Sequence, residues 1–208
     1  MSRAGHGTAT KKNSIAIIML QALRARQMKK PRDILVTDKL IYVSDYAAHQ
    51  IFVFDCVSHQ LIQSIQTTNM RNPRGMCMCN GLLCIACYGK PLGKIVQLNP
   101  ETRTEENVFV APRPRGIVAP SSRYLFVTEV DDNCVGIYAI DGTRKGEFGR
   151  GILSQPRGIA LGRDGTIFVA DSANDRIVIF DSNGQIQTFV EDVDAPNDVF
   201  CDDHIIFV

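Results

Sequence analysis

A dipeptide that returns at a fixed interval limits the fold of this chain more than any other feature of the sequence. A proline recurs at intervals of 42, 41, 42 and 40 residues, and an arginine follows it in every copy but the last. The five copies are Pro31-Arg32, Pro73-Arg74, Pro114-Arg115, Pro156-Arg157 and Pro196-Asn197. A fixed period in the forties indicates a chain built from repeated supersecondary units.

Each repeat holds short runs of β-forming residues separated by turns. The second run reads LIYVSD, LLCIAC, YLFVTE or TIFVAD, and the third reads QIFVFD, KIVQLN, CVGIYAI or RIVIFD. Short runs rich in Val, Ile, Phe and Tyr and bounded by tight turns predict strands rather than helices. With the run after the proline and a fourth run such as LIQSI, each repeat has four antiparallel strands. This predicts an all-β fold, a β-propeller of four-stranded antiparallel blades.

The fourth copy has the most specific order of residues. PRGIA begins at Pro156, GTIFVAD ends at Asp171, Asn174 follows, and RIVIFD begins at Arg176. This order resembles the NHL repeat, whose domains are typically six-bladed propellers. The resemblance covers residues 30–208.

Two copies depart from the NHL pattern. The second has Cys87 where the pattern has an acid, and the third has Cys134 where it has Arg or Lys. The second copy therefore differs from the others in the charge of its loop.

The repeats divide the chain into about five blades' worth of sequence. The expected parts are a disordered tail at 1–12, strands of a preceding or closing blade at 13–29, and propeller blades at 30–71, 72–112, 113–154, 155–194 and, in part, 195–208. Because the sequence stops at HIIFV, inside a predicted strand, we favour a truncated fragment or relative of a six-bladed ring. The alternative is a five-bladed ring closed by pairing of the two half blades.

Composition limits the class of protein and its compartment. The 208 residues carry a formal net charge of +1, which argues against a strongly basic nucleic-acid protein but allows a local basic patch. Seven cysteines, an odd number, favour reduced thiols and a cytoplasmic location. No apolar run reaches the length of a membrane helix, so no membrane association is expected. The oligomeric state stays open.

The arginines of the Pro-Arg pairs are the first candidate site residues. Antiparallel strands bring alternate connections to one face, so these arginines are expected to surround the mouth of the central channel. The structural interpretation pairs three of them with the acids that end the second strands. The predicted pairs are Arg32 with Asp45, Arg115 with Glu129, and Arg157 with Asp171.

The second repeat supplies the candidate ligand-binding face. Cys87 replaces the acid and leaves Arg74 without this partner, while Tyr46 and Tyr88 occupy matching loops of adjacent blades. Tyrosines among cations can stack on bases or receive an acidic peptide. The alternative is an ordinary solvated rim with tyrosines half-buried between blades. The predicted ligand-binding residues on this top face are Arg32, Tyr46, His49, Arg74, Tyr88, Lys90, Lys94 and Arg115.

Several cysteines and polar residues could belong to a metal site or could serve the fold alone. The stretch MCMCNGLLCIAC could suggest zinc, but Cys77 and Cys79 lie on one strand face while Cys84 and Cys87 lie on opposite faces of the next. We therefore expect thiols that fill the core, no cofactor and no catalytic residues. Asn197 and Asp198 keep a calcium site of the lactonase type as a weak alternative, since Pro-Asn-Asp is similar to a stretch in those enzymes.

The resemblance to NHL proteins implies a function. It implies a non-catalytic recognition domain like those of tripartite-motif and RING-type ubiquitin ligases, where the propeller binds protein or single-stranded RNA. No RING or B-box is present in this sequence, so ligase activity would reside in other sequence. The expected partner is a protein or acidic peptide, with single-stranded RNA as a further candidate. The alternative function is a calcium- or zinc-dependent propeller hydrolase or lyase of the lactonase or amidating-lyase type.

Overall fold

The computed structural model describes residues 28–90, 92–202 and 205–207. The tail predicted at 1–12 and nearly all of the strands predicted at 13–29 lie outside the described residues.

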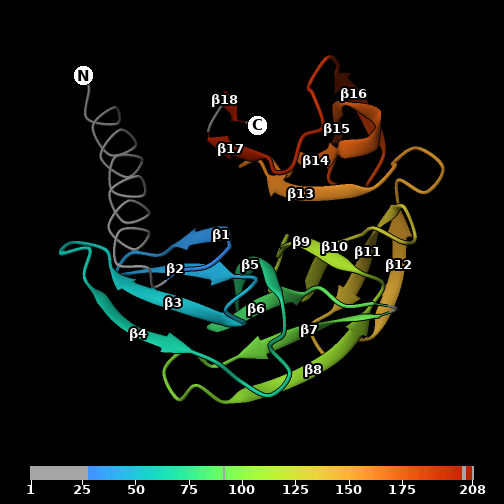
Figure 1. The fold of residues 1–208 in the computed structure, drawn as a ribbon. Helices are drawn as coiled ribbons and strands as arrows, with labels where there is room; N and C mark the ends of the chain where they lie inside the picture. The colour runs from blue at the N-terminus through green and yellow to red at the C-terminus, as the bar shows by residue number, and fades with distance from the viewer. Residues whose placement is uncertain (1–27, 91, 203–204, 208) are drawn as a thin grey trace.

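Four sheets of four antiparallel strands make up most of the described chain (Figure 1). Each sheet lies within one of the expected repeats. The first blade contains β1 (Pro31–Val36), β2 (Leu40–Asp45), β3 (Gln50–Asp55) and β4 (Leu61–Ile65). The second contains β5 (Pro73–Cys79), β6 (Leu82–Cys87), β7 (Gly93–Leu98) and β8 (Glu105–Ala111).

The third and fourth blades repeat this order. The third contains β9 (Pro114–Val118), β10 (Tyr124–Glu129), β11 (Cys134–Ala139) and β12 (Arg144–Phe148). The fourth contains β13 (Pro156–Leu161), β14 (Ile167–Asp171), the 3-10 turn η1 (Ser172–Asn174), β15 (Arg176–Phe180) and β16 (Ile186–Val190). A separate hairpin follows, made of β17 (Phe200–Asp202) and β18 (Ile205–Phe207).

The first strands of the blades lie side by side around a central cavity. β1 contacts β5, β5 contacts β9, β9 contacts β13, and β13 contacts β17. Figure 1 shows these strands gathered toward the middle, with β4, β8 and β12 on the outside. The five strands line a cavity of about 980 Å³. The all-β propeller fold predicted from the repeat is therefore confirmed.

The hydrophobic core is divided into layers between successive blades. Ile51 and Val53 of β3 pack with Leu83 and Ile85 of β6 between the first two blades. Similar layers lie between the second and third blades and between the third and fourth. This division follows from strands whose two faces are both apolar, because each sheet must bury both faces against its neighbours.

The glycine of the Pro-Arg-Gly triplet allows the first strands to approach closely. A Cβ atom at Gly75 would lie 2.6 Å from the carbonyl oxygen of Arg115, and one at Gly116 would lie 2.7 Å from that of Arg157. These distances are too short for any side chain, so glycine is required at these two junctions between blades.

Among the described residues, no helix is long and apolar enough to cross a membrane.

Candidate functional site

The arginines of the four Pro-Arg pairs line the mouth of the channel. Each follows the proline that begins the first strand of its blade, and each borders the central cavity. All of them are half-buried. The partners of these side chains decide whether they hold the fold together or can bind a ligand.

The predicted pair Arg32–Asp45 is wrong. Asp45 is fully buried, and its carboxylate accepts hydrogen bonds from four backbone amides instead. These amides, 2.6–3.0 Å away, belong to Lys29, Lys30, Ala47 and Ala48. The buried acid is therefore satisfied by the loops around it and does not need the guanidinium of Arg32.

The predicted pair Arg157–Asp171 is also wrong, and strand register gives the reason. Asp171 lies directly opposite Arg176 in the β14–β15 pair, so both side chains share one face of the sheet. The Nε of Arg176 donates to Asp171 at 2.8 Å, and the amide of Ser154 donates to the same carboxylate at 2.6 Å. In the fourth blade, the acid that ends the second strand therefore pairs with the first residue of the third strand.

The predicted pair Arg115–Glu129 fails for the same reason, with one difference. The residue opposite Glu129 is Cys134, which cannot supply a positive charge. Arg144 of β12 supplies it instead, with its Nη2 2.9 Å from the Glu129 carboxylate. Tyr138 donates a short hydrogen bond to the other Glu129 oxygen.

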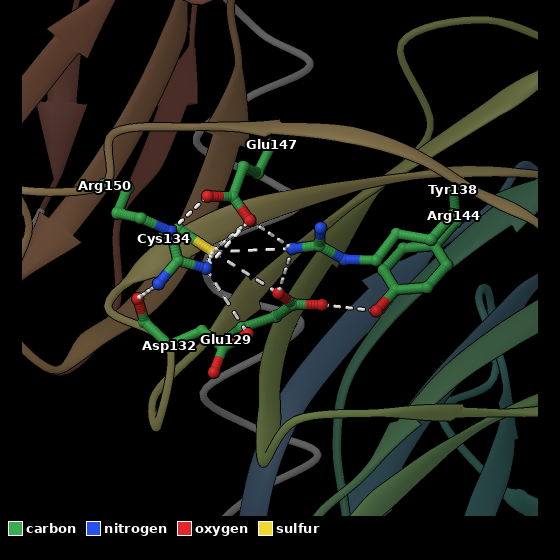
Figure 2. Close-up of polar contacts among 7 residues, drawn as sticks. All are labelled: Glu129, Asp132, Cys134, Tyr138, Arg144, Glu147 and Arg150. Atoms are coloured by element: carbon green, nitrogen blue, oxygen red, sulfur yellow. Dashed lines mark hydrogen bonds and ion pairs between the residues drawn. The ribbon is translucent and has the colours of Figure 1, made fainter.

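Figure 2 shows that this acid lies in a larger network of charges in the third blade. Arg144 and Arg150 both bind Glu147, and their hydrogen bonds lower the pKa of Glu147 to about 2. Burial first, and then Glu129, raises the pKa values of the Cys134 thiol and the Tyr138 hydroxyl. Cys134 and Tyr138 therefore stay protonated at neutral pH.

Three side chains of a kind that can coordinate metal ions lie in this network. Ligand atoms of Glu129, Asp132 and Cys134 lie within 4.8 Å of one another. Arg144 and Arg150 already bind Glu129 and Asp132, and two guanidinium groups beside the same atoms oppose the binding of a cation. The network is better described as a structural ion-pair cluster than as a metal centre.

Three of the four arginines at the channel mouth lie over tyrosine rings, whereas Arg144 binds acids and Arg176 binds Asp171 while also lying over the Phe189 ring. The guanidinium carbon of Arg74 lies 4.8 Å from the ring centroid of Tyr46 and 4.7 Å from that of Tyr88. Arg32 lies 5.5 Å from Tyr46, and Arg115 lies 5.8 Å from Tyr88. We call these five residues, which alternate over three blades, the arginine–tyrosine ladder.

The charge of the arginine–tyrosine ladder is not neutralised by ion pairs of the described residues. None of the ion pairs found among the described residues includes Arg32, Arg74 or Arg115. Their Nε atoms, like those of Arg113 and Arg157, are buried without a hydrogen-bond partner in this part of the chain. Burial, followed by the neighbouring Arg32, lowers the pKa of Arg74. Burial and then Arg74 and Arg157 lower the pKa of Arg115 to about 10. The ladder thus holds like charges close together.

Comparison with known proteins supports the repeat and the fold. The NHL repeat family matches residues 153–180, which span β13 to β15. The match thus covers the first three strands of the fourth blade. No curated protein sequence matches the chain significantly.

Solved structures similar to this chain include two lyases and a synthase, all at low identity. Virginiamycin B lyase from Staphylococcus aureus is 16% identical, with a TM-score of 0.59 over 82% of this chain and 73% of that one. A streptogramin B lyase structure is 19% identical, with a TM-score of 0.63 over 81% and 58% of the two chains. Hydrazine synthase from Kuenenia stuttgartiensis is 15% identical, with a TM-score of 0.67 over 82% and 65%. In two of these three comparisons the chain spans less than two thirds of the other protein. At these identities the likeness establishes the fold alone.

The structure does not bring all predicted ligand-binding residues into the ladder. Lys94 lies opposite Cys87 in blade two, and its Nζ donates to Asn69 at 2.5 Å. The Nδ1 atom of His49 accepts the amide of Asn72 at 3.1 Å, which joins the first two blades. Lys90 is exposed in the loop after Tyr88.

Two further cations near the arginine–tyrosine ladder were missed from the sequence. Arg113 lies 5.4 Å from the Tyr88 ring and also pairs with Asp131, while the Nζ of Lys30 lies 5.6 Å from the Tyr46 ring. Both residues come directly before the proline of a repeat, in the sequences RPR and KPR. A search for cations on both sides of the recurring proline would have found them.

Two carboxyl groups occupy the channel. Asp33 and Asp198 stand at the position that is glycine in the three repeats between them, and both line the cavity. Burial, followed by the charge of Asp198, raises the pKa of Asp33 to about 7. Asp33 also accepts the amide of Met76 in the next blade at 2.6 Å. Asn197, the other residue of the weak calcium alternative, accepts a hydrogen bond from Arg157 at 3.1 Å.

The cysteines of the second blade fill the core as predicted. Cys77, Cys79 and Cys84 pack between the second and third blades, and Cys87 packs on the other face toward the first blade. Cys77 lies directly opposite Cys84 in the β5–β6 pair. Their burial among apolar side chains is the usual setting of structural thiols.

Proposed function

We propose that this NHL-type propeller is a non-catalytic binding module whose arginine–tyrosine ladder docks an acidic segment of a protein partner. The observation that carries the proposal is a row of half-buried arginines held by aromatic rings and left without acids of their own. Keeping like charges together costs free energy in the unbound protein. An anionic ligand would recover that cost, which favours a binding role for this face.

The tyrosine contacts favour a protein ligand over single-stranded RNA. Proteins bind unpaired bases largely by stacking them on free aromatic faces. The ring of Tyr46 already has Arg32 and Arg74 over it, and the ring of Tyr88 has Arg74 and Arg115 over it. The stacking capacity of these rings serves to orient guanidinium groups, which recognise negative charge rather than base identity.

A recognition role in ubiquitin transfer is consistent with this proposal. In that case the propeller selects a substrate by an acidic segment, and the ligase activity belongs to sequence beyond this chain. A cytoplasmic setting, proposed from the cysteine content, would give such a module access to cytoplasmic substrates.

Binding can be measured by fluorescence anisotropy with three probes. These are a short Glu-rich peptide, the same peptide with Gln in place of Glu, and a single-stranded RNA of mixed sequence. We expect the Glu-rich peptide to bind best, to weaken as salt is raised, and to lose at least about tenfold in affinity with Arg74→Ala. Arg123→Ala is the matched control, because Arg123 is exposed at the opposite end of the third blade. RNA that binds more tightly than the Glu-rich peptide would overturn the choice of a protein ligand.

The channel carboxyl groups favour a second candidate, a metal-dependent enzyme. Asp33 and Asp198 both line a cavity of about 980 Å³, and Asp198 lies close enough for its charge to raise the pKa of Asp33. Carboxylates are ligands that calcium prefers. Elemental analysis of the purified protein tests this candidate: calcium or zinc near one per chain, lost in Asp33→Asn, would support it, and a metal-free protein would remove it.

A further inference from the structure

We infer that the anionic group recognised by the arginine–tyrosine ladder is a phosphorylated serine or threonine, so that phosphorylation of the partner switches docking on. This inference rests on the proposed function, because it names the ligand class of the same site. Three features of the arginines support it: they are close together, they lack acid partners among the described residues, and aromatic rings orient their guanidinium groups.

The first argument is the density of positive charge. Four blades each contribute one arginine to the channel mouth, and neighbouring members are close enough to affect one another. A carboxylate brings one negative charge. A phosphomonoester brings about 1.5 to 2 negative charges and three acceptor oxygens on a single group. The more concentrated anion suits guanidinium groups that converge from successive blades.

The second argument concerns the binding partners of the acids at the ends of the second strands. Asp45, Glu129 and Asp171 could each have neutralised a channel-mouth arginine, yet each has other partners within its own blade. Arg113 shows the contrast, since it also lies over Tyr88 but is paired with Asp131. The fold therefore supplies acids to the outer arginines and none, among the described residues, to those of the ladder.

The third argument is the orientation of the guanidinium groups. Arg74 lies between the rings of Tyr46 and Tyr88, within 4.8 Å of both centroids. Contacts with two rings that are tilted 55° to each other restrict the Arg74 side chain, and because its Nε is buried, the donors that can reach a ligand are those of the terminal Nη groups. That fork of donors matches the oxygens of a phosphoryl group and can bind two of them at once. Held in advance by the rings, the fork loses little conformational entropy on binding.

The cavity beneath the ladder leaves room for residues next to the phosphorylated one. Below the arginines the residues that line the cavity include the apolar Ile34, Met76 and Ile117 as well as the two carboxyl groups of Asp33 and Asp198. A phosphoryl group at the mouth and an apolar neighbour in the channel would together fill a site of mixed character. This feature favours a phosphopeptide over free phosphate, which cannot use the apolar side chains of the wall.

The test compares peptide mixtures that differ at one position. Each has randomised neutral and apolar flanks around a central phosphoserine, glutamate or serine, and inorganic phosphate serves as a competitor. We expect the phosphoserine mixture to bind at least about tenfold more tightly than the glutamate mixture, a difference of about 1.4 kcal/mol. Inorganic phosphate should compete only at much higher concentration than the phosphopeptides.

Variants can distinguish recognition by a planar guanidinium from simple attraction to a positive charge. Arg74→Lys keeps the charge but loses the planar fork, so it should remove most of the preference for phosphoserine while changing glutamate binding much less. Arg115→Lys is the second variant, and Arg123→Lys is the matched control with no expected effect. Thermal unfolding of each variant checks that it is folded.

The outcomes distinguish this inference from the proposed function. Equal affinity for the phosphoserine and glutamate mixtures, both lost in Arg74→Ala, would overturn the phosphate assignment and leave the acidic docking site intact. Binding of neither mixture would overturn both. An unchanged phosphoserine preference in Arg74→Lys and Arg115→Lys would show that the ladder does not provide the selectivity.

Discussion

Arginines serve two regions of this protein in opposite ways. Within the third and fourth blades, Arg144 and Arg176 bind the fully buried acids Glu129 and Asp171 at 2.9 and 2.8 Å. At the channel mouth, Arg74 lies over Tyr46 and Tyr88 and has no acid partner among the described residues. The first kind of contact satisfies both charges, while the second orients a cation and leaves its charge available.

The difference teaches how to separate structural arginines from candidate binding arginines in a repeat protein. An arginine that pairs with a buried acid is needed to keep that acid charged inside the fold. Arg74 lies over two tyrosine rings and has no acid partner among the described residues, so we expect it to contribute less to folding and more to recognition. The two regions should therefore respond differently to substitution, and the following experiments test that expectation.

The largest expected effect is on stability, from loss of a buried acid. Asp171→Ala would leave the Nε of Arg176 and the amide of Ser154 without their acceptor. We expect the free energy of unfolding to fall by about 3–5 kcal/mol. Urea denaturation measures the change, with the exposed Glu101→Ala as the control. A loss below about 1 kcal/mol would show that the acid is not structural.

The next effect concerns pH and tests whether the ladder charges reach the channel. The pKa of Asp33 is about 7 in the folded protein, against about 3.9 when unfolded. Between these values the folded protein holds a proton that the unfolded chain has lost, so stability falls as pH rises, by up to about 1.4 kcal/mol per unit. Above pH 7 this contribution no longer changes.

Asp33→Asn should flatten this pH dependence. The amide of asparagine keeps an acceptor for the Met76 or Ile34 backbone N–H but carries no charge. Urea denaturation at pH 5, 6, 7 and 8 should show a smaller loss of stability for the variant than for the parent. The opposite result is a parent stability that rises over this range and an Asp33→Asn variant that does not follow it. That result would mean that the channel-mouth arginines keep Asp33 ionised in the folded protein.

A smaller effect is expected when a ladder arginine is removed. Arg74→Ala should leave the free energy of unfolding within about 0.5 kcal/mol of the parent, since it also relieves repulsion from Arg32. The same variant should lose about tenfold in affinity for an acidic peptide. Denaturation and anisotropy on one preparation measure both quantities. A large loss of stability would place Arg74 with the structural arginines.

The sequence predicted the fold far better than the partners of the charged side chains. The period of the Pro-Arg pairs and the runs of β-forming residues define the blades, because these patterns are local in sequence and recur in every repeat. The pairs of Arg32, Arg115 and Arg157 were wrong because an acid at a strand end has several neighbours in space. Strand register decides among them, as in the Asp171–Arg176 pair, and register becomes visible only when the third strand is aligned residue by residue.

The sequence predicted that the residues of the arginine–tyrosine ladder lie on one face, but it did not predict the contacts between the rings and the guanidinium groups. Tyr46 and Tyr88 were expected to offer faces to a ligand, whereas the structure places guanidinium groups over them. Their side chains come from loops of different blades, so the contact depends on how blades pack around the channel. Lys94 was predicted to bind a ligand at the same face, and in the structure it lies opposite Cys87 and donates to Asn69.

The smallest effect, and the most specific test of the ladder, is removal of one ring. Tyr88→Leu keeps an apolar side chain but removes the aromatic face under Arg74 and Arg115. Each cation–π contact contributes about 0.5–1 kcal/mol at a partly exposed site, so the affinity for an acidic peptide should fall by severalfold while the net charge is unchanged. Tyr124→Leu, an exposed tyrosine at the opposite end of the third blade, is the control. Because Tyr88→Leu removes no charge, a loss of affinity would show that orientation of the guanidinium groups, and not charge alone, determines binding. Unchanged affinity would mean that the arginines bind equally well without the rings, and the aromatic contacts would then belong to the packing of the blades.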